Sequence, residues 1–93
     1  MTRDLAESMA IQALTFLAED PDRLQRFLAT TGVGPQQIRA AAREPEFLAG
    51  VLSHLAADEP LLVTFAEQVG IDPFDVRRAS DRLMPDGWER DVP

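Results

Sequence analysis

The stretches LATTGVGPQQIRAA (residues 28–41) and AEQVGIDPFDVRRA (residues 66–79) decide how this chain is expected to fold. In both, a glycine follows an apolar run and a proline stands three residues after the glycine. Glycine at that place is typical of a left-handed helix C-cap, because it has no Cβ to clash there. Proline suits the first turn of the next helix, where its missing N–H would have no partner. Each stretch therefore predicts two helices joined by a tight corner, with Gly32 and Gly70 at positive φ.

The corner recurs because a longer unit recurs. Shifted by 38 residues, segment 17–41 matches segment 55–79 without gaps, with nine identities in 25 positions. A repeat of this length is typical of one supersecondary unit used twice. Ninety-three residues are enough for one compact domain, spanning 1–93. We therefore predict an all-α fold of six short helices in two tandem, pseudo-equivalent three-helix units, at about 5–43 and 45–84, followed by a tail at 85–93.

Residues that typically begin or end helices indicate where the helices of each unit lie. The first unit is expected to hold helices at about 4–19, 21–31 and 35–43, and Glu44-Pro45 opens the second unit. Asp20 and Asp58 are good N-caps, because a carboxylate accepts the free N–H groups of a first helical turn. Helical spacing of the apolar residues predicts the inward-facing side chains, which are Leu5, Met9, Ala13, Leu14 and Leu17 in the first helix, Ile38, Ala41 and Ala42 in the third, and Val76, Ala79 and Leu83 in the last.

One long run carries a family resemblance. It is FLAEDPDRLQRFLATTGVGPQQIRAAAREPEFLAGVLSHLAADEPLLVTFAEQVGIDPFDVRRA, in which the strings FLAEDP…RFL…TG…P and FL…VL…L…DE…LL…FA…G…P are the specific ones. The run resembles the small, mostly alphaproteobacterial proteins catalogued as domain of unknown function 3572, over about residues 9–84. The resemblance implies a small helical protein. It brings no activity, cofactor or binding residue with it.

The charge balance narrows the classes of function. The chain has 16 acidic residues and nine basic ones, all of them arginine, for a net charge of −7. Such a balance repels nucleic acid and anionic membranes unless the bases are segregated. There is no cysteine, which excludes disulfides, thiol nucleophiles and cysteine-held metals. No stretch approaches the roughly 20 apolar residues that span a bilayer, and the N-terminus does not resemble a signal peptide. We expect a soluble cytoplasmic protein without membrane contact.

The second corner has the spacing of a DNA-reading helix-turn-helix. Ala66 stands four residues before Gly70, and Val76 stands six residues after it. The small residue and the glycine allow two helices to approach at a steep angle, and the apolar residue locks the corner. These requirements belong to the corner and not to DNA, so a structural corner is the preferred interpretation.

Recognition of DNA requires suitable side chains on the second helix of that corner. Arg77, Arg78 and Arg82 are the candidate nucleic-acid contacts, but Asp75 and Asp81 offset two of them. A nucleic-acid-binding regulator is therefore the second hypothesis, and we expect nucleic acid not to be the partner.

Enzymatic function is the third hypothesis, centred on His54. Asp58 lies one helical turn away and could accept a hydrogen bond from the imidazole, but Ser53 points about 100° away on the same helix, which is poor geometry for a triad. A lone histidine is also a poor metal site. We therefore expect a structural histidine, and we predict no catalytic residue, no metal and no cofactor.

The differences between the two repeats point to a surface. Leu61, Val63 and Phe74 stand where the first repeat has Arg23, Gln25 and Gln36, and Trp88 lies in the tail. The first interpretation is internal packing, with the tail folded over the last helix. The alternative is an apolar patch for a protein partner or for self-association, which makes these four the candidate interaction residues. We expect Leu61 and Val63 to be buried and Phe74 and Trp88 to be partly exposed. The preferred hypothesis is a non-enzymatic protein-interaction module.

Overall fold

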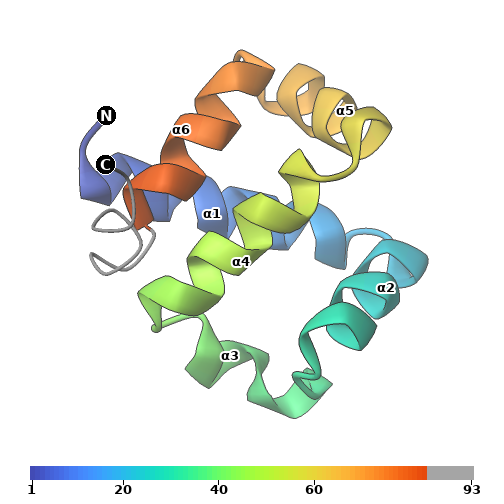
Figure 1. Ribbon diagram of the computed structural model, residues 1–93. Coiled ribbons are helices and arrows are strands. Elements are labelled where there is room, and N and C mark those ends of the chain that lie inside the picture. Colours follow the sequence, from blue (N-terminus) through green and yellow to red (C-terminus); the bar gives the residue numbers. More distant parts are fainter. Residues whose placement is uncertain (84–93) are drawn as a thin grey trace, which may run out of the picture.

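The computed structural model describes residues 1–83, and helices make up nearly all of this part (Figure 1). The elements are α1 (Arg3–Ala18), α2 (Pro21–Thr31), the 3₁₀ turn η1 (Pro35–Gln37), α3 (Ile38–Ala41), α4 (Pro45–Ala56), α5 (Glu59–Val69) and α6 (Pro73–Leu83). Residues 1–83 contain no strand, so the predicted all-α class with six helices is confirmed. The predicted tail, with Trp88 in it, lies outside the described residues.

The predicted aspartate caps are confirmed. The side chain of Asp20 accepts a hydrogen bond from the N–H of Asp22 at 3.0 Å and opens α2. The side chain of Asp58 accepts one from the N–H of Leu61 at 3.3 Å and opens α5. Each cap satisfies a first-turn donor that the helix itself leaves without a partner.

The two glycines also have the predicted left-handed conformation. Gly32 has a φ of 77° and Gly70 a φ of 75°. At Gly70 the N–H of Ile71 donates to the carbonyl of Ala66 at 2.9 Å, which is the outer bond of a Schellman motif.

At Gly32 the outer bond of this motif is replaced by a side-chain contact. The N–H of Val33 donates instead to the hydroxyl of Thr31 at 3.3 Å. That hydroxyl in turn donates to the carbonyl of Leu28 at 3.3 Å, so the side chain relays the bond that the backbone makes directly in the second unit. Threonine at position 31 makes this relay possible, whereas Val69 at the matching place has no hydroxyl.

Replacing Gly32 or Gly70 with alanine is expected to lower the free energy of unfolding by about 1 kcal/mol. No atom lies within 4 Å of a Cβ built at either glycine, so the whole cost comes from the left-handed backbone. Gly50 is the matched control, because it lies inside α4, has no positive φ and also has open space around an added Cβ. Alanine at Gly50 should be neutral or stabilising. Urea unfolding measures all three variants, and equal midpoints for them would contradict the assignment.

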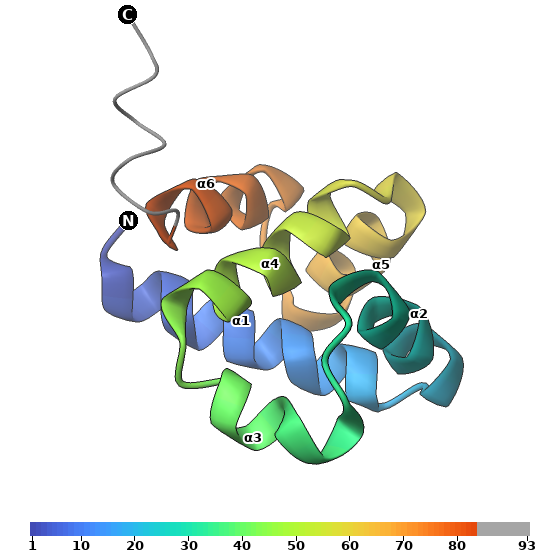
Figure 2. The same ribbon diagram turned by 60° about the horizontal axis from the view of Figure 1, so that its bottom comes forward.

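Three helices form the centre of the protein. Helix α4 crosses α1 and lies beside α6, and α6 also packs on α1 (Figure 1). Helices α2 and α5 lie near the C-terminal end of α1 (Figure 2). Their contacts enclose one cluster of buried apolar side chains. The largest of these are Phe16, Phe27, Phe65, Leu17, Leu52 and Leu55.

Helix α1 contacts the core with a face that differs in part from the predicted one. Leu5 was expected to point inward, but it is 60% exposed. Ala6 and Ala10 are fully buried in its place, and Ala13 is fully buried as predicted. The reason is the double crossing by α4 and α6, because small side chains let helix backbones approach closely. Leu17 is buried as predicted, and Met9 and Leu14 are half-buried against the core.

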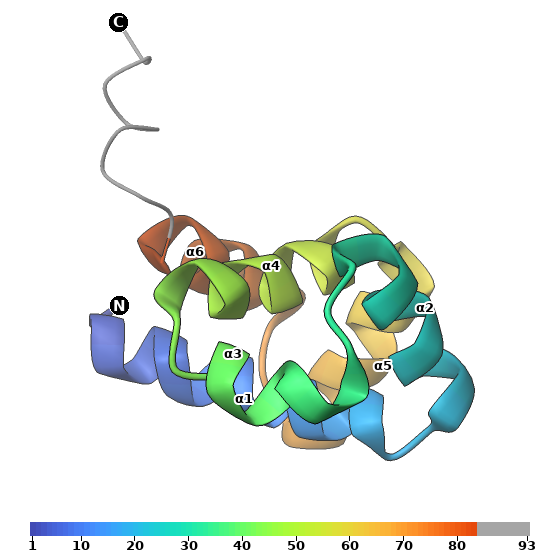
Figure 3. The same cartoon turned by 90° about the horizontal axis from the view of Figure 1, so that it is seen from below.

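The third helix of the first unit is shorter than predicted. In place of one helix at 35–43 the chain forms the turn η1 and the four-residue α3, and neither contains a buried residue. Ile38, Ala41 and Ala42 are therefore half-buried at most, and α3 lies at the edge of the molecule (Figure 3). The matching helix α6 is long and buries Val76 and Leu83. The superposition of the two complete units stays a prediction.

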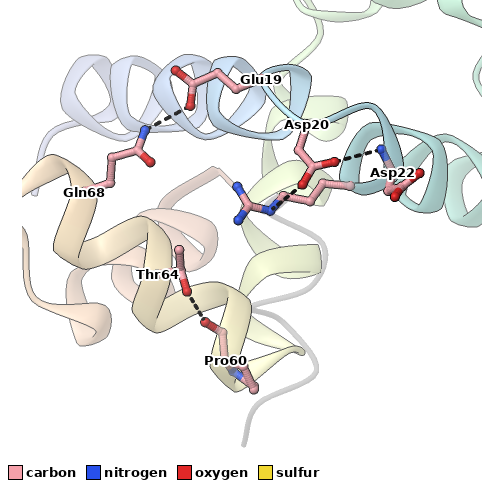
Figure 4. Close-up of polar contacts among 7 residues, drawn as sticks. Glu19, Asp20, Asp22, Pro60, Thr64 and Gln68 are labelled. Atoms are coloured by element: carbon pink, nitrogen blue, oxygen red, sulfur yellow. Dashed lines mark hydrogen bonds and ion pairs between the residues drawn. The ribbon is translucent and has the colours of Figure 1, made fainter.

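Polar contacts fasten the corner between α1 and α2 (Figure 4). The amide of Gln68 on α5 donates to the carboxylate of Glu19 at 3.0 Å and ties α5 to the end of α1. The guanidinium of Arg23 lies 3.6 Å from the carboxylate of Asp20 and 4.4 Å from the ring centroid of Phe16. This stacking covers an aromatic ring of the core with a cation, an arrangement that attracts electrostatically.

Helix α4 is the most buried of the central helices. Its buried side chains are Leu48, Ala49, Val51, Leu52 and Leu55.

Within residues 1–83 no single helix has both the length and the apolar character to cross a membrane. Helices α4 and α5 meet those criteria only together, as a pair bent by 108°.

Candidate functional site

The outward side of α6 gathers most of the candidate residues. The helix begins where the carboxylate of Asp72 accepts a hydrogen bond from the N–H of Phe74 at 2.8 Å. Its apolar residues recur at helical spacing, so Val76, Ala79 and Leu83 are buried against the core, as predicted. The opposite side, here called the α6 outer face, consists of Phe74, Arg77, Arg78, Asp81 and Arg82, all of them exposed.

Phe74 is the most exposed large apolar side chain of residues 1–83, at 62%. Its predicted exposure is confirmed. Leu61, which was expected to be buried, is only half-buried against the core. Val63 was expected to be buried, but it is 37% exposed. Because α5 turns Leu62 and Phe65 inward, Val63 is rotated toward solvent.

The α6 outer face carries three positive charges and one negative charge. Arg78 is neutralised within its own helix, where its guanidinium lies 3.7 Å from the carboxylate of Asp75. Within residues 1–83, Arg77, Asp81 and Arg82 take part in no ion pair. Within the described residues, no oppositely charged side chain neutralises them.

A shallow hollow adjoins this face, between α4 and α6. It has a volume of about 410 Å³. Here called the serine hollow, it is lined by Ser53 and Ala56 of α4, by Ala57 directly after α4, and by Arg77, Ser80 and Asp81 of α6. The hydroxyls of Ser53 and Ser80 lie 2.8 Å apart and share a hydrogen bond. The small α4 side chains leave the space open, and the serine pair joins the two helices at its floor.

Sequence reasoning missed the Ser53–Ser80 contact. A signal was present, because Ser80 lies four residues after Val76 and three before Leu83, which puts it on the buried stripe of α6. Ser80 is only 5% exposed. A serine on such a stripe requires a hydrogen-bonding partner, since a buried polar group without one is costly.

His54 packs against the aromatic core. Its ring stands edge-to-face on Phe27, with the centroids 5.2 Å apart. Within residues 1–83 the structure has no hydrogen bond between the imidazole and Asp58, whose carboxylate caps α5 instead. The hydroxyl of Ser53 bonds to Ser80, so Ser53, His54 and Asp58 do not form a triad. Residues 1–83 also contain no group of three potential metal-binding side chains.

Burial lowers the pKa of His54 from its usual value of 6.5, and the carboxylate of Asp58 opposes this effect by favouring the charged ring. We expect the native state to lose stability on acidification through this residue. Because the folded-state pKa lies below the unfolded-state pKa, the unfolded chain binds the proton first as the pH falls. The stabilising contribution of the neutral ring is therefore fully present above pH 6.5 and is lost as the pH falls through the lower, folded-state pKa.

The test uses the fact that His54 is the only histidine. Its imidazole proton resonances are followed by NMR through a pH titration, and their midpoint should lie below 6.5. Urea unfolding of wild type and His54→Gln over the same pH range isolates the residue, because the carboxylates titrate in both proteins. A resonance midpoint above 6.5 would contradict the expectation.

The corner between α5 and α6 satisfies the steric pattern of a helix-turn-helix. Ala66 is 2% exposed, Val76 is fully buried, and Gly70 has the left-handed conformation between them. Arg77, Arg78 and Arg82, the candidate nucleic-acid contacts, are all exposed, but Asp75 and Asp81 lie among them.

Comparison with known proteins adds a family but no activity. No curated protein matches the chain, and no solved structure does. A family model described as "Protein of unknown function (DUF3572)" matches residues 3–86, which include all six helices and the α6 outer face. The predicted resemblance is thereby confirmed, and this chain belongs to the DUF3572 family.

Proposed function

We propose that the chain is a small, non-enzymatic, cytoplasmic protein-interaction module whose docking surface is the α6 outer face. The observation that carries the proposal is the 62% exposure of Phe74 on a helix whose other side forms the core. Interface centres favour an aromatic anchor with arginine beside it, and Arg77 follows Phe74 by one helical turn. The serine hollow, which is lined by Arg77 and Asp81 of this face, supplies relief that a flat surface lacks.

Affinity capture with matched baits tests the proposal. The baits are wild type, Phe74→Ser and Leu5→Ser, because Leu5 on α1 is similarly exposed, at 60%, but lies on another helix. We expect at least one protein, identified by mass spectrometry, to be retained by wild type and Leu5→Ser and lost with Phe74→Ser. The melting temperatures of the three baits should agree, since both residues are exposed. Identical captures with all three baits would refute this docking surface.

A nucleic-acid regulator remains the second candidate, supported by the buried corner at Ala66 and Val76 and by the exposed arginines that follow it. The local charge disfavours it, because Asp72, Asp75 and Asp81 formally balance the three arginines of residues 72–83. A protein that contacts phosphates needs a surplus of cations along the contact.

We therefore expect no binding of duplex DNA at physiological ionic strength. Fluorescence anisotropy with labelled fragments of mixed sequence measures it, first at low salt and then at physiological salt. Micromolar or tighter binding at physiological salt that weakens in Arg77→Ala and Arg78→Ala would favour the second candidate over the first. Binding confined to low salt would reflect weak, non-specific attraction only.

A further inference from the structure

The order of apolar and charged side chains along the α6 outer face indicates which kind of partner it fits. Phe74, Arg77 and Asp81 follow one another at helical spacing, so they lie along one side of α6. Arg77 and Asp81 carry opposite charges one turn apart and make no ion pair within residues 1–83. A uniformly acidic or basic partner would be attracted by one of these charges and repelled by the other.

The serine hollow favours an apolar occupant. Its two hydroxyls already bond to each other at 2.8 Å, and within residues 1–83 no buried side-chain nitrogen or oxygen lacks a hydrogen-bond partner. Ala56 and Ala57 line it on the α4 side. The hollow has a volume of about 410 Å³ and is a shallow depression, open to solvent, next to Arg77 and Asp81.

We infer that the occupant is a second copy of this chain, bound through antiparallel contact of the two α6 outer faces around a twofold axis; the inference rests on the proposed docking surface. In a twofold interface, a residue that contacts another is contacted by that same residue of the other copy. With the axis between positions 77 and 81, each Arg77 pairs with Asp81 of the second copy. With the same axis, each exposed Phe74 ring lies against the C-terminal end of the second copy's α6, at one end of the interface.

The remaining charges are compatible with this arrangement. Arg78 is paired with Asp75 in its own helix, at 3.7 Å. Arg82 lies toward the C-terminal end of α6, so antiparallel contact places the two Arg82 side chains at opposite ends of the interface. The net charge of −7 on each copy opposes association over long range, but a Debye length of about 8 Å at physiological ionic strength screens it.

Charge reversal tests the pairing. Sedimentation velocity over a range of concentrations at physiological ionic strength gives the dimer dissociation constant. Arg77→Asp alone and Asp81→Arg alone each replace both ion pairs with like-charge contacts, so each should weaken dimerisation by at least about tenfold. The double variant Arg77→Asp with Asp81→Arg restores opposite charges and should restore the dimer. Both residues are exposed, and thermal unfolding should show that all variants remain folded.

Two further variants locate the contact. Phe74→Ser should abolish the dimer, and Leu5→Ser on α1 should leave it intact. A strictly monomeric wild type would overturn the inference. A dimer whose dissociation constant is unchanged by the charge reversals and by Phe74→Ser would also overturn it. A monomer that still captures another protein through Phe74 would overturn the second copy as partner while leaving the docking surface in place. A monomer without any Phe74-dependent capture would overturn both.

Discussion

Truncating Phe65 to alanine is expected to lower the free energy of unfolding by about 3–5 kcal/mol. The side chain is fully buried, and its ring centroid lies 5.3 Å from that of Phe16. The two rings join α5 to α1 across the core, so removal of one leaves a cavity that the neighbouring helices cannot close. Because a whole domain is stable by only about 5–15 kcal/mol, the variant should lose a large share of its stability.

The same substitution at an exposed ring provides the control. Phe74→Ala removes an identical side chain that is 62% exposed, and its effect should be within about 0.5 kcal/mol. Urea unfolding followed by circular dichroism measures both variants, with the slopes compared to confirm two-state behaviour. Equal losses at positions 65 and 74 would mean that Phe74 belongs to the core and that the proposed docking surface does not exist.

Enlarging Ala10 to leucine is expected to destabilise the protein by about 1–3 kcal/mol, although leucine is more apolar and also favours helix. Ala10 is fully buried on the side of α1 that faces the crossing helices, so a larger side chain must displace α4 or α6. Ala18→Leu is the control, because Ala18 is an exposed residue of the same helix. Thermal unfolding compares the two variants, and an Ala10→Leu protein as stable as wild type would show that the helices do not approach closely there.

The features predicted best from the sequence are the helix ends, which depend on interactions between residues close together in the chain. Asp20 and Asp58 cap helices, and Gly32 and Gly70 end them, because caps depend on backbone groups only a few residues away. The predicted exposure of Phe74, whose match in the first repeat is Gln36, also succeeded.

Long-range packing was harder to predict. Apolar spacing assigned Leu5 to the core, but spacing does not say how closely another helix will cross, and a close crossing selects alanine. The serine hollow was beyond reach for the same reason, because it exists only where α4 and α6 lie side by side. Val63 shows a related limit, since an apolar residue next to an inward-facing one can remain at the surface.

The alanine face of α1 has a consequence for synthesis on the ribosome. Helix α1 is made before α4 and α6, the two helices that cover Ala6, Ala10 and Ala13. Until Pro73–Leu83 has been translated, that face of the nascent chain lacks one of its two covers. Incompletely folded chains aggregate through exposed apolar surface, and a methyl group exposes far less of it than a leucine side chain does. A helix that must wait for its partners is thus a safer intermediate when its contact face is built from alanine.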